Sequence, residues 1–450
     1  MKISHLSLSE ELELNDRYGC YKYEHIINIF TEIEHYLEKN NITKTDYLVW
    51  QCENSVKSAI AIIYFLTHQY SFLLIPIDSD IEIPKFCHYI LKNFSIKTPD
   101  INWEIKSNAN WNGKQAITDS PFLYVRTSGT TGKPKLIAHN HEKLWNNALN
   151  AGHRLGLTAN DRISIPVPIY HLFGLGAGFL PSVLKGASVD LQNKANILTY
   201  LQREKSFNPN IAFMTPSFAQ TLLKARKAER LYRFTVMAGD RILSDTFDRY
   251  EEKFGNIVTL YGSSEMGVMA IANSDESVEI RKNTVGKPLS GVEMKLEEGE
   301  VQQLLCLHQY AFTGYLDENG DWLSLIENDW FPTKDLAQID DDGYLTILGR
   351  SDYCINRDGL LVLLTDIDKA IETITGVETA ITVTTGESKR GKQLKSYCTL
   401  AKKSPLTDTE IRKACFDLLP LRAVPDEVTI VSRLPLLPNG KVDRQKLTIT

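Results

Sequence analysis

Short apolar runs rich in β-branched and aromatic residues alternate with helix-like stretches through the middle of the chain. This alternation predicts a largely parallel β-sheet with helices on both faces. Ligands on such sheets bind at the carboxyl ends of the strands, so we expect functional residues directly after the runs. The runs lie at residues 122–125, 162–167, 211–214, 234–237 and 257–261.

Segments with other patterns flank this region. Residues 23–38 have a helical pattern, and residues 47–50 have the composition of a strand. The most apolar window, residues 59–77, is interrupted by His68, Gln69 and Tyr70, which predicts a helix followed by a buried strand and not a membrane span. Beyond Gly286, short strands and turns predict a small antiparallel β subdomain.

The pattern changes again after Arg350. We expect Thr365 and Asp366 to cap the start of a helix that ends near Gly376, and residues 407–410 to form a capping box for a second helix. Strand-like runs accompany these helices, at residues 379–383, 394–400 and 427–431. The tail therefore reads as a compact α+β unit of about one hundred residues.

These patterns together predict an α/β protein with two domains. The large N-terminal domain, residues 1–351, would contain mostly parallel sheets flanked by helices, with a first subdomain at 1–120 and a small antiparallel β subdomain. The small C-terminal domain would span residues 352–450 and have an α+β fold. A chain of this length is long enough for both.

Composition narrows the class of protein. Of 450 residues, 24% are charged and 43% are hydrophobic, as in ordinary globular proteins. The net charge of -6 argues against nucleic acid as the main partner. Seven cysteines without a CxxC pair argue against a disulfide framework and a zinc site. Met1 is not followed by a signal-peptide pattern, so we expect a cytoplasmic protein.

A loop rich in glycine, hydroxyl and ammonium groups follows the apolar run at residues 122–125. Its backbone N–H groups, hydroxyls and cations can converge on phosphate oxygens. Gly129 and Gly132 are separated by two residues and Pro134 follows Lys133, so the loop is not a Walker A loop. We expect it to connect a strand to a helix. The candidate phosphate-binding residues are Thr127, Ser128, Gly129, Thr130, Thr131, Gly132 and Lys135.

The run from Thr127 to Lys135 is similar, without a mismatch, to the phosphate-loop signature of the adenylate-forming superfamily. That superfamily includes acyl- and aryl-CoA synthetases, adenylation domains of peptide synthetases, and luciferases. Further stretches resemble its other motifs in the same order, at residues 261–265, 330–335, 342–352 and 437–444. The resemblance implies binding of ATP and Mg²⁺ and a C-terminal domain that moves.

The stretch Tyr261-Gly-Ser-Ser-Glu265 resembles the family's Tyr-Gly-x-Thr-Glu motif. By resemblance, Glu265 is the Mg²⁺ ligand, Ser264 contacts the α-phosphate and Tyr261 flanks the adenine. A carboxylate suits Mg²⁺, which prefers hard oxygen ligands. The alternative reading of this pentapeptide is a turn with a solvated glutamate.

Two motifs near the domain boundary resemble the family's ribose-binding and hinge segments. Asp335 would hold the ribose hydroxyls, since a carboxylate can accept two hydrogen bonds from a diol. Lys334 stands where the family has glycine, which makes the local turn a departure. Arg350 would contact ribose and phosphate, and Asp352 would be the hinge. Asn356 replaces the family's lysine.

Two further residues are candidates by resemblance. Lys441 lies in the family's C-terminal loop, whose lysine bridges the substrate carboxylate and the nucleotide. His171 follows Tyr170 where the family's aryl- and acyl-activating members gate the carboxylate pocket; a structural histidine is the alternative. The glycines at 174, 176 and 178 could open room for a substrate or allow close helix packing.

The resemblance implies a ligase with two half-reactions. A carboxylic acid, aryl or acyl rather than α-amino, would be activated by ATP as an acyl-adenylate and then transferred to a pantetheine thiol of CoA or of a carrier protein. The alternatives are amino-acid adenylation for a carrier protein, a luciferase-like oxygenase, and a nucleotide-binding protein without turnover. The sequence does not identify the acid, the acceptor or the oligomeric state.

Overall fold

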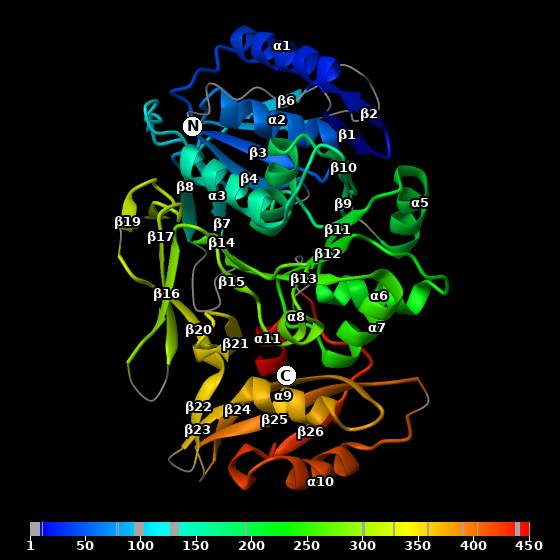
Figure 1. Ribbon diagram of the computed structural model, residues 1–450. Helices are drawn as coiled ribbons and strands as arrows, with labels where there is room; N and C mark the ends of the chain where they lie inside the picture. Colours follow the sequence, from blue (N-terminus) through cyan, green and yellow to red (C-terminus); the bar gives the residue numbers. More distant parts are fainter. Residues whose placement is uncertain are drawn as a thin grey trace. The chain divides into compact units, whose positions relative to one another are not determined.

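The protein was analysed as a computed structural model (Figure 1). The residues that it describes are 10, 12–77, 79, 81–93, 103–126, 135–193, 196–298, 302–326, 329–357, 360–388, 391–402, 404–436 and 442–449.

An eight-stranded sheet has the strand order β19-β18-β8-β7-β4-β3-β5-β6. Its central strands β7, β4, β3 and β5 pair in parallel, whereas β8 runs antiparallel to β7. Its strands are β3 (Leu48–Cys52), β4 (Phe72–Pro76), β5 (Tyr89–Asn93), β6 (Trp103–Ser107), β7 (Phe122–Arg126), β8 (Leu136–Asn140), β18 (Gly314–Leu316) and β19 (Trp322–Leu325).

A nine-stranded sheet has the order β15-β14-β13-β12-β11-β9-β10-β1-β2. Strands β9 to β13 pair in parallel, as the sequence predicted for this region. Its strands are β1 (Glu13–Asp16), β2 (Gly19–Lys22), β9 (Arg162–Ile165), β10 (Ser188–Leu191), β11 (Ile211–Met214), β12 (Phe234–Met237), β13 (Ile257–Ser263), β14 (Gly267–Ile271) and β15 (Lys287–Pro288).

Helices bury the faces of these two sheets. Strand β11 shows why: Ile211 and Phe213 enter one hydrophobic cluster, and Ala212 and Met214 enter another on the opposite face, because successive strand residues alternate sides. Helices α5 to α7 supply the second cluster. The helices are α1 (Tyr23–Lys39), α2 (Val56–Thr67), α3 (His141–Arg154), η2 (Phe173–Phe179), α4 (Leu180–Leu184), α5 (Ile197–Phe207), α6 (Pro216–Ala225), α7 (Ser244–Phe254) and α8 (Val278–Asn283).

A smaller four-stranded sheet has the order β16-β17-β20-β21, as expected for the short strands beyond Gly286. Its strands are β16 (Val292–Leu296), β17 (Gln303–His308), β20 (Phe331–Ile339) and β21 (Leu345–Arg350). The chain divides into two compact units. Unit 1 comprises residues 1–294, 306–331 and 341–345, and unit 2 comprises residues 295–305, 332–340 and 346–450.

The C-terminal part of unit 2 is an α+β assembly around the sheet β23-β22-β25-β24, with β26 paired to β25. A hydrophobic cluster joins helices α9 and α10 to this sheet through residues such as Ile367 and Ile411. The elements are η3 (Ser351–Tyr353), β22 (Cys354–Arg357), β23 (Leu360–Leu363), α9 (Leu364–Glu372), β24 (Val377–Ser388), β25 (Gly391–Leu400), α10 (Asp408–Leu418), η4 (Leu421–Ala423), β26 (Glu427–Ile430) and α11 (Arg444–Ile449).

The two predicted helix starts in this region have different outcomes. The capping box at α10 is confirmed, because Thr407 Oγ1 accepts from the Glu410 N–H and the Glu410 carboxylate accepts from the Thr407 N–H. The prediction of a helix cap at Thr365 and Asp366 is wrong. Helix α9 begins at Leu364 with no side-chain cap, and the Thr365 hydroxyl instead donates to the Leu348 carbonyl at 3.0 Å.

The connection after β7 also differs from the prediction. The chain enters strand β8, which pairs antiparallel with β7 from Phe122↔Asn140 to Arg126↔Leu136. The predicted phosphate loop therefore joins two neighbouring strands and not a strand and a helix. Strand β7 also belongs to a different sheet from β9 to β13, so the single parallel sheet expected from residues 122–261 is divided between two.

The apolar window at residues 59–77 forms helix α2 and strand β4, as predicted. No helix in the described part of the chain is long and apolar enough to span a bilayer. All seven cysteines lie among the described residues and none forms a disulfide.

Candidate functional site

The Tyr-Gly-Ser-Ser-Glu motif lies at the end of strand β13 in unit 1. Tyr261 pairs with Ala270, and the register shifts between Tyr261 and Gly262. A Cβ atom at Gly262 would lie 2.5 Å from the Gly267 carbonyl oxygen, so this position requires glycine. A bulge of this kind bends a strand and redirects its side chains. It therefore sets the direction in which Ser264 and Glu265 leave the sheet.

Three hydrogen bonds fix the segment that follows. The Phe312 N–H donates to the Glu265 carbonyl at 2.9 Å, and the Tyr315 hydroxyl donates to Glu265 Oε1 at 3.1 Å. His139 Nε2 lies 2.7 Å from the Ser264 carbonyl oxygen. Burial lowers the pKa of His139 to about 4, so a neutral ring donates this bond near pH 7. Backbone and carboxylate are thus held independently.

Lys135, the last residue of the predicted phosphate loop, contacts the tyrosine that donates to this carboxylate. Its Nζ atom stands 4.9 Å from the centre of the Tyr315 ring, within the range of a cation–π contact. The same tyrosine therefore contacts both Lys135 and Glu265. The other loop residues fall outside the described part of the chain: Thr127, Ser128, Gly129, Thr130, Thr131 and Gly132.

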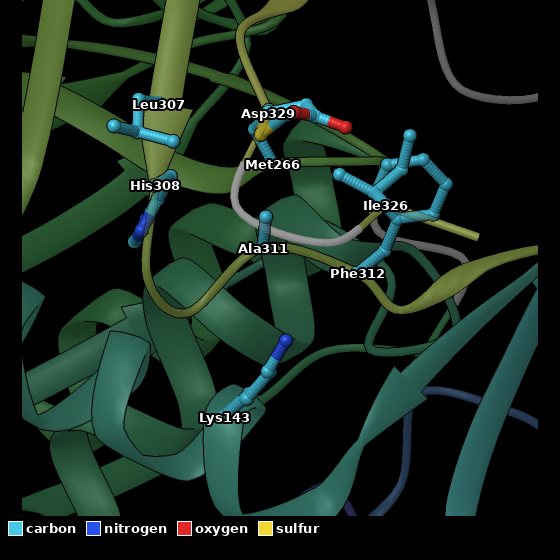
Figure 2. A pocket seen from close by; sticks show the side chains of 8 residues that line it. All are labelled: Lys143, Met266, Leu307, His308, Ala311, Phe312, Ile326 and Asp329. Atoms are coloured by element: carbon cyan, nitrogen blue, oxygen red, sulfur yellow. The ribbon is translucent and has the colours of Figure 1, made fainter.

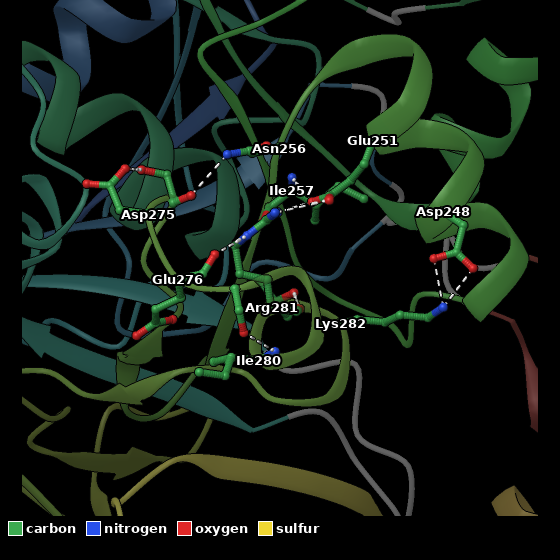
Figure 3. Close-up of polar contacts among 12 residues, drawn as sticks. Asp248, Glu251, Asn256, Ile257, Asp275, Glu276, Ile280, Arg281 and Lys282 are labelled. Atoms are coloured by element: carbon green, nitrogen blue, oxygen red, sulfur yellow. Dashed lines mark hydrogen bonds and ion pairs between the residues drawn. The ribbon is translucent and has the colours of Figure 1, made fainter.

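The opposite end of strand β13 is held by a buried ion pair (Figure 3). The guanidinium of Arg281 pairs with Glu251 and also donates to the Ile257 carbonyl at 3.2 Å. Glu251 in turn accepts from the Ile257 N–H at 2.8 Å. The Arg281 side chain is only 3% exposed. This clamp fixes helices α7 and α8 against the start of the strand that carries Tyr261.

A small cavity lies next to Met266 and Phe312. Met266 follows Glu265 in the sequence, and Phe312 donates a hydrogen bond to the Glu265 carbonyl. Its volume is about 10 Å³, roughly the space that one water requires. Lys143, His308 and Asp329 supply its polar lining, and the Lys143 ammonium points toward Ala311 (Figure 2). The cavity is therefore too small to hold a carboxylic acid substrate.

His171 lies just before η2, a π-helix that spans Phe173–Phe179. π-helical turns are rare and occur frequently at functional sites. The His171 ring is half-buried and contacts the Tyr170 ring, with 4.8 Å between ring centres. A Cβ at Gly174 would lie 2.2 Å from the Pro168 carbonyl oxygen. At Gly174, close packing thus explains the glycine.

The sequence did not point to Asn54, which holds the segment leading to His171. Asn54 is 2% exposed. Its amide nitrogen lies within 3.2 Å of the carbonyl oxygens of Ile165 and Val167, and its Oδ1 accepts from the Ile169 N–H at 3.1 Å. An asparagine at a strand end carries no distinctive pattern, so only the fold reveals this role.

Unit 2 brings three of the predicted residues together. Arg350 Nε lies 3.6 Å from Asp335 Oδ1, and an Arg350 terminal nitrogen lies 3.4 Å from Asp352 Oδ2. Asp335 is 9% exposed. Lys334 has φ +63°, the left-handed conformation in which glycine carries no steric penalty. Lys334 thus adopts, at a steric cost, a backbone conformation that the family's glycine would adopt freely.

Lys441 falls outside the described part of the chain, so its predicted role stays a prediction. Besides Asn54, sequence reasoning missed His139 and Tyr315 in unit 1. Both lie on strands of the eight-stranded sheet, β8 and β18, which pair with each other. Their proximity to Glu265 depends on strands about 180 residues apart in the sequence, which no local motif announces.

The donor set at Glu265 fits Mg²⁺. In nucleotide sites this ion usually takes one or two carboxylates and completes its coordination with phosphate oxygens and water. Glu265 Oε1 accepts from Tyr315, and no residue in the described part of the chain forms a hydrogen bond or an ion pair with Oε2. No cluster of three or more acidic, histidine or cysteine ligands occurs among the described residues. A single carboxylate oxygen therefore remains for a phosphate-bound cation.

Several curated proteins are similar in sequence. The chain is 28% identical over 344 residues to oxalate–CoA ligase of Arabidopsis thaliana, which covers 73% of this chain and 67% of that protein. It is 27% identical over 338 residues to a putative acyl-CoA synthetase of Bacillus subtilis, an alignment that covers 71% of this chain and 62% of that protein. It is also 28% identical over 342 residues to 2-succinylbenzoate–CoA ligase of Bacillus licheniformis, with 73% and 70% covered. The chain thus matches about two thirds of these relatives' length.

Solved structures share the fold. ATP-bound MatB from Rhodopseudomonas palustris aligns with a TM-score of 0.84 at 18% identity and covers 100% of this chain and 98% of that one. O-succinylbenzoate CoA synthetase from Bacillus subtilis, in complex with its acyl-adenylate, aligns with a TM-score of 0.79 at 19% identity and covers 96% and 94%. These alignments confirm the predicted mixed α/β fold class.

The model of the AMP-binding enzyme family matches residues 58–311. This segment is more than half of the 450 residues and contains both the predicted phosphate loop and the Glu265 motif. The relatives named above are acid–CoA ligases or acyl-CoA synthetases, the enzyme class that the motifs indicated. The chain belongs to the AMP-binding enzyme family.

Proposed function

We propose that this protein is an acid–thiol ligase that activates a carboxylic acid with ATP. In the first half-reaction, a carboxylate oxygen attacks the α-phosphorus of ATP, the bond to pyrophosphate breaks, and an acyl-adenylate forms. In the second, a thiol sulfur attacks the acyl carbon and AMP leaves. The observation that carries the proposal is the grouping of Lys135, Tyr315 and Glu265 beside the predicted phosphate loop.

The protein's contribution to the first step is electrostatic and positional. Phosphoryl-type transfers need little covalent help, and preorganised charges stabilise the transition state. Lys135 and Lys441 would bind phosphate oxygens, while Ser264 would donate to the α-phosphate. Mg²⁺, when bound at Glu265, neutralises negative charge on the phosphates. Tyr261 would flank the adenine.

The residues of unit 2 would contact the nucleotide sugar. Asp335 can accept hydrogen bonds from both ribose hydroxyls. Arg350, which lies 3.6 Å from that carboxylate, can hold it in place and contact a phosphate. We propose Asp352, in the 3₁₀ turn η3, as the hinge about which the C-terminal domain (352–450) turns between the two half-reactions.

We propose the pantetheine thiol of CoA as the acceptor. The named relatives are CoA ligases, and each of them covers a similar share of this chain. A carrier protein presents the same thiol, so it remains the alternative acceptor for the same chemistry. For the acid, His171 beside the π-helix supports an aryl or acyl substrate, since this position supplies no carboxylate to pair with an α-amine.

ATP–pyrophosphate exchange tests the first half-reaction. Purified protein is incubated with ATP, labelled pyrophosphate and separate pools of aryl, fatty, dicarboxylic and amino acids, without thiol. Exchange with an aryl, fatty or dicarboxylic pool supports the proposal and identifies the acid class. Exchange with amino acids alone would move the assignment to amino-acid activation. No exchange from folded protein that binds ATP would overturn the ligase assignment in favour of nucleotide binding without turnover.

A further inference from the structure

The carboxylate of Glu265 has one internal hydrogen-bond donor. That donor is the hydroxyl of Tyr315 on strand β18, 3.1 Å from Oε1. Glu265 Oε2 receives no hydrogen bond from any residue that the structure describes. One oxygen is thus fixed internally and the other remains available to a ligand.

The backbone around Glu265 is held without help from this tyrosine. Phe312 N–H donates to the Glu265 carbonyl, and His139 holds the Ser264 carbonyl. Strand β18 itself pairs with β8, for example at Tyr315↔Ile137. Removing the Tyr315 hydroxyl would therefore release the rotation of the Glu265 side chain and leave its backbone in place.

Two contacts hold the Tyr315 ring in place. It packs edge-on against Phe312, with 4.9 Å between ring centres, and lies under the Lys135 ammonium at 4.9 Å.

We propose that Tyr315 is a positioning residue for the cation carboxylate. Its hydroxyl fixes Glu265 Oε1 so that Oε2 faces a phosphate-bound divalent cation, and its ring keeps Lys135 next to the same phosphates. The inference rests on the proposed function, because it assigns Glu265 to the Mg²⁺ of bound ATP. A tyrosine that merely packs against Phe312 would not affect metal dependence.

The test is Tyr315→Phe, which keeps the ring and its contacts with Phe312 and Lys135 and removes only the hydroxyl. Binding of ATP is measured by calorimetry with Mg²⁺, with Mn²⁺ and with EDTA, so that turnover is not needed. We expect the metal concentration at which half of the increase in ATP affinity is reached to rise about tenfold. The reason is that hydrogen bonds to charged groups contribute a stabilisation of this order. Affinity in EDTA should be unchanged.

Tyr310→Phe is the matched control, because Tyr310 lies in the same segment, its backbone N–H donates to His308, and its hydroxyl forms no hydrogen bond with any residue that the structure describes. It should leave the metal dependence unchanged. In a Glu265→Gln background, Tyr315→Phe should add no further loss, because paired residues show coupled and not additive effects.

Each outcome decides the inference. A wild-type metal dependence in Tyr315→Phe, or an equal further loss in the Glu265→Gln background, would overturn it. Weaker ATP binding in EDTA with unchanged metal dependence would indicate a packing role only. Tyr315→Phe could weaken the metal effect on ATP binding while the wild type shows no acid-dependent exchange. That combination would support the inference and overturn the ligase assignment. No metal effect in the wild type would overturn the inference, whereas the ligase assignment depends on the exchange assay alone.

Discussion

Among the individual residues of the candidate site, Lys334 carries the clearest backbone strain. It has φ +63° inside strand β20, whereas the other non-glycine residues with positive φ in the described chain follow helices: Asn41, Gln69 and Asn208. Its carbonyl accepts from the Ser351 hydroxyl at 3.0 Å, and Asp335 N–H donates to Thr333 Oγ1 at 3.1 Å. These bonds hold the strained turn beside the predicted ribose carboxylate.

Lys334→Gly should therefore stabilise the protein. Relief of the left-handed strain is worth about 1 kcal/mol, partly offset by the greater chain entropy of glycine in the unfolded state. We expect a gain of roughly 0.5 kcal/mol or more in the free energy of unfolding, measured by urea denaturation. Lys334→Ala keeps the Cβ atom and should show no gain. An equal gain from alanine would assign the effect to the ammonium group instead of the backbone.

At this scale the sequence predicted residues that lie inside motifs and missed those that reach the site through the fold. Glu265 and Lys135 could be named because their motifs are contiguous. Tyr315 and His139 could not, because their approach to Glu265 depends on the pairing of β18 with β8. The strain at Lys334 was visible only as a departure from glycine.

The secondary-structure elements around the site depend on how strand β13 is anchored. Its far end is bulged at Gly262 and its near end is clamped by Arg281 and Glu251. Both partners are largely buried, with side chains 3% and 12% exposed. Loss of one partner leaves an uncompensated charge in a poorly solvated place.

Arg281→Ala should destabilise the protein by about 3 kcal/mol, because breaking a buried pair leaves the Glu251 carboxylate without its partner. The neighbouring Lys282→Ala is the matched control. Lys282 pairs with Asp248, whose side chain is 55% exposed. Its replacement by alanine should therefore lower the free energy of unfolding by less than about 1 kcal/mol. Chemical denaturation of both variants measures this difference. Equal losses would show that Arg281 does not act as a clamp.

The elements themselves were predictable to different degrees. Strands β11 and β12 occupy residues 211–214 and 234–237, as the apolar runs indicated, because buried parallel strands read as continuous apolar runs. Strand β8 was missed, since Leu136–Asn140 includes polar residues and lies between a lysine-rich loop and helix α3. Its histidine, His139, is buried and contacts the Ser264 carbonyl oxygen, a contact that depends on the fold and not on the local pattern.

The molecule as a whole carries several histidines that burial keeps neutral. Burial lowers the pKa of His139 and of His308 to about 4, and that of His141 to about 3. The ordinary histidine pKa is about 6.5, so the unfolded chain binds protons that the folded chain does not. The stability from these groups is fully present above pH 6.5 and is lost as the pH falls toward 4.

We expect the free energy of unfolding to fall by up to about 1.4 kcal/mol per pH unit for each such histidine below pH 6. His141→Leu should reduce that slope by about 1 kcal/mol per unit relative to wild type. Urea unfolding at pH 7, 6 and 5 measures it. The exposed His35 gives the control, because His35→Gln should leave the slope unchanged. An unchanged slope in His141→Leu would mean that this ring is charged in the fold.

The proposed domain rotation predicts that a restricted hinge slows one half-reaction more than the other. Proline at residue 352 fixes φ and so restricts the turn at η3. Asp352→Pro should slow thioester formation by about tenfold or more and change acyl-adenylate formation by less than about twofold. Pyrophosphate release and thioester yield are followed separately in rapid-quench experiments. Equal slowing of both steps would argue against a hinge at this residue.

At the scale of the chain, the fold class and the family could be predicted, because motifs and apolar alternation extend through most of the sequence. The division of residues 122–261 between two sheets could not. Whether β7 pairs with β4 or with β9 depends on contacts between distant segments, and single-strand patterns are the same in either case.

The antiparallel pair β7–β8 has a practical consequence for engineering. The antiparallel ladder ends with the pair Arg126↔Leu136, so an insert between these two residues begins and ends on the same rung. Doubling the length of such a connection costs only about 0.6 kcal/mol of closure entropy. Libraries with exchanged or lengthened loops at this point should keep the surrounding scaffold intact, which makes it a suitable place to vary phosphate binding.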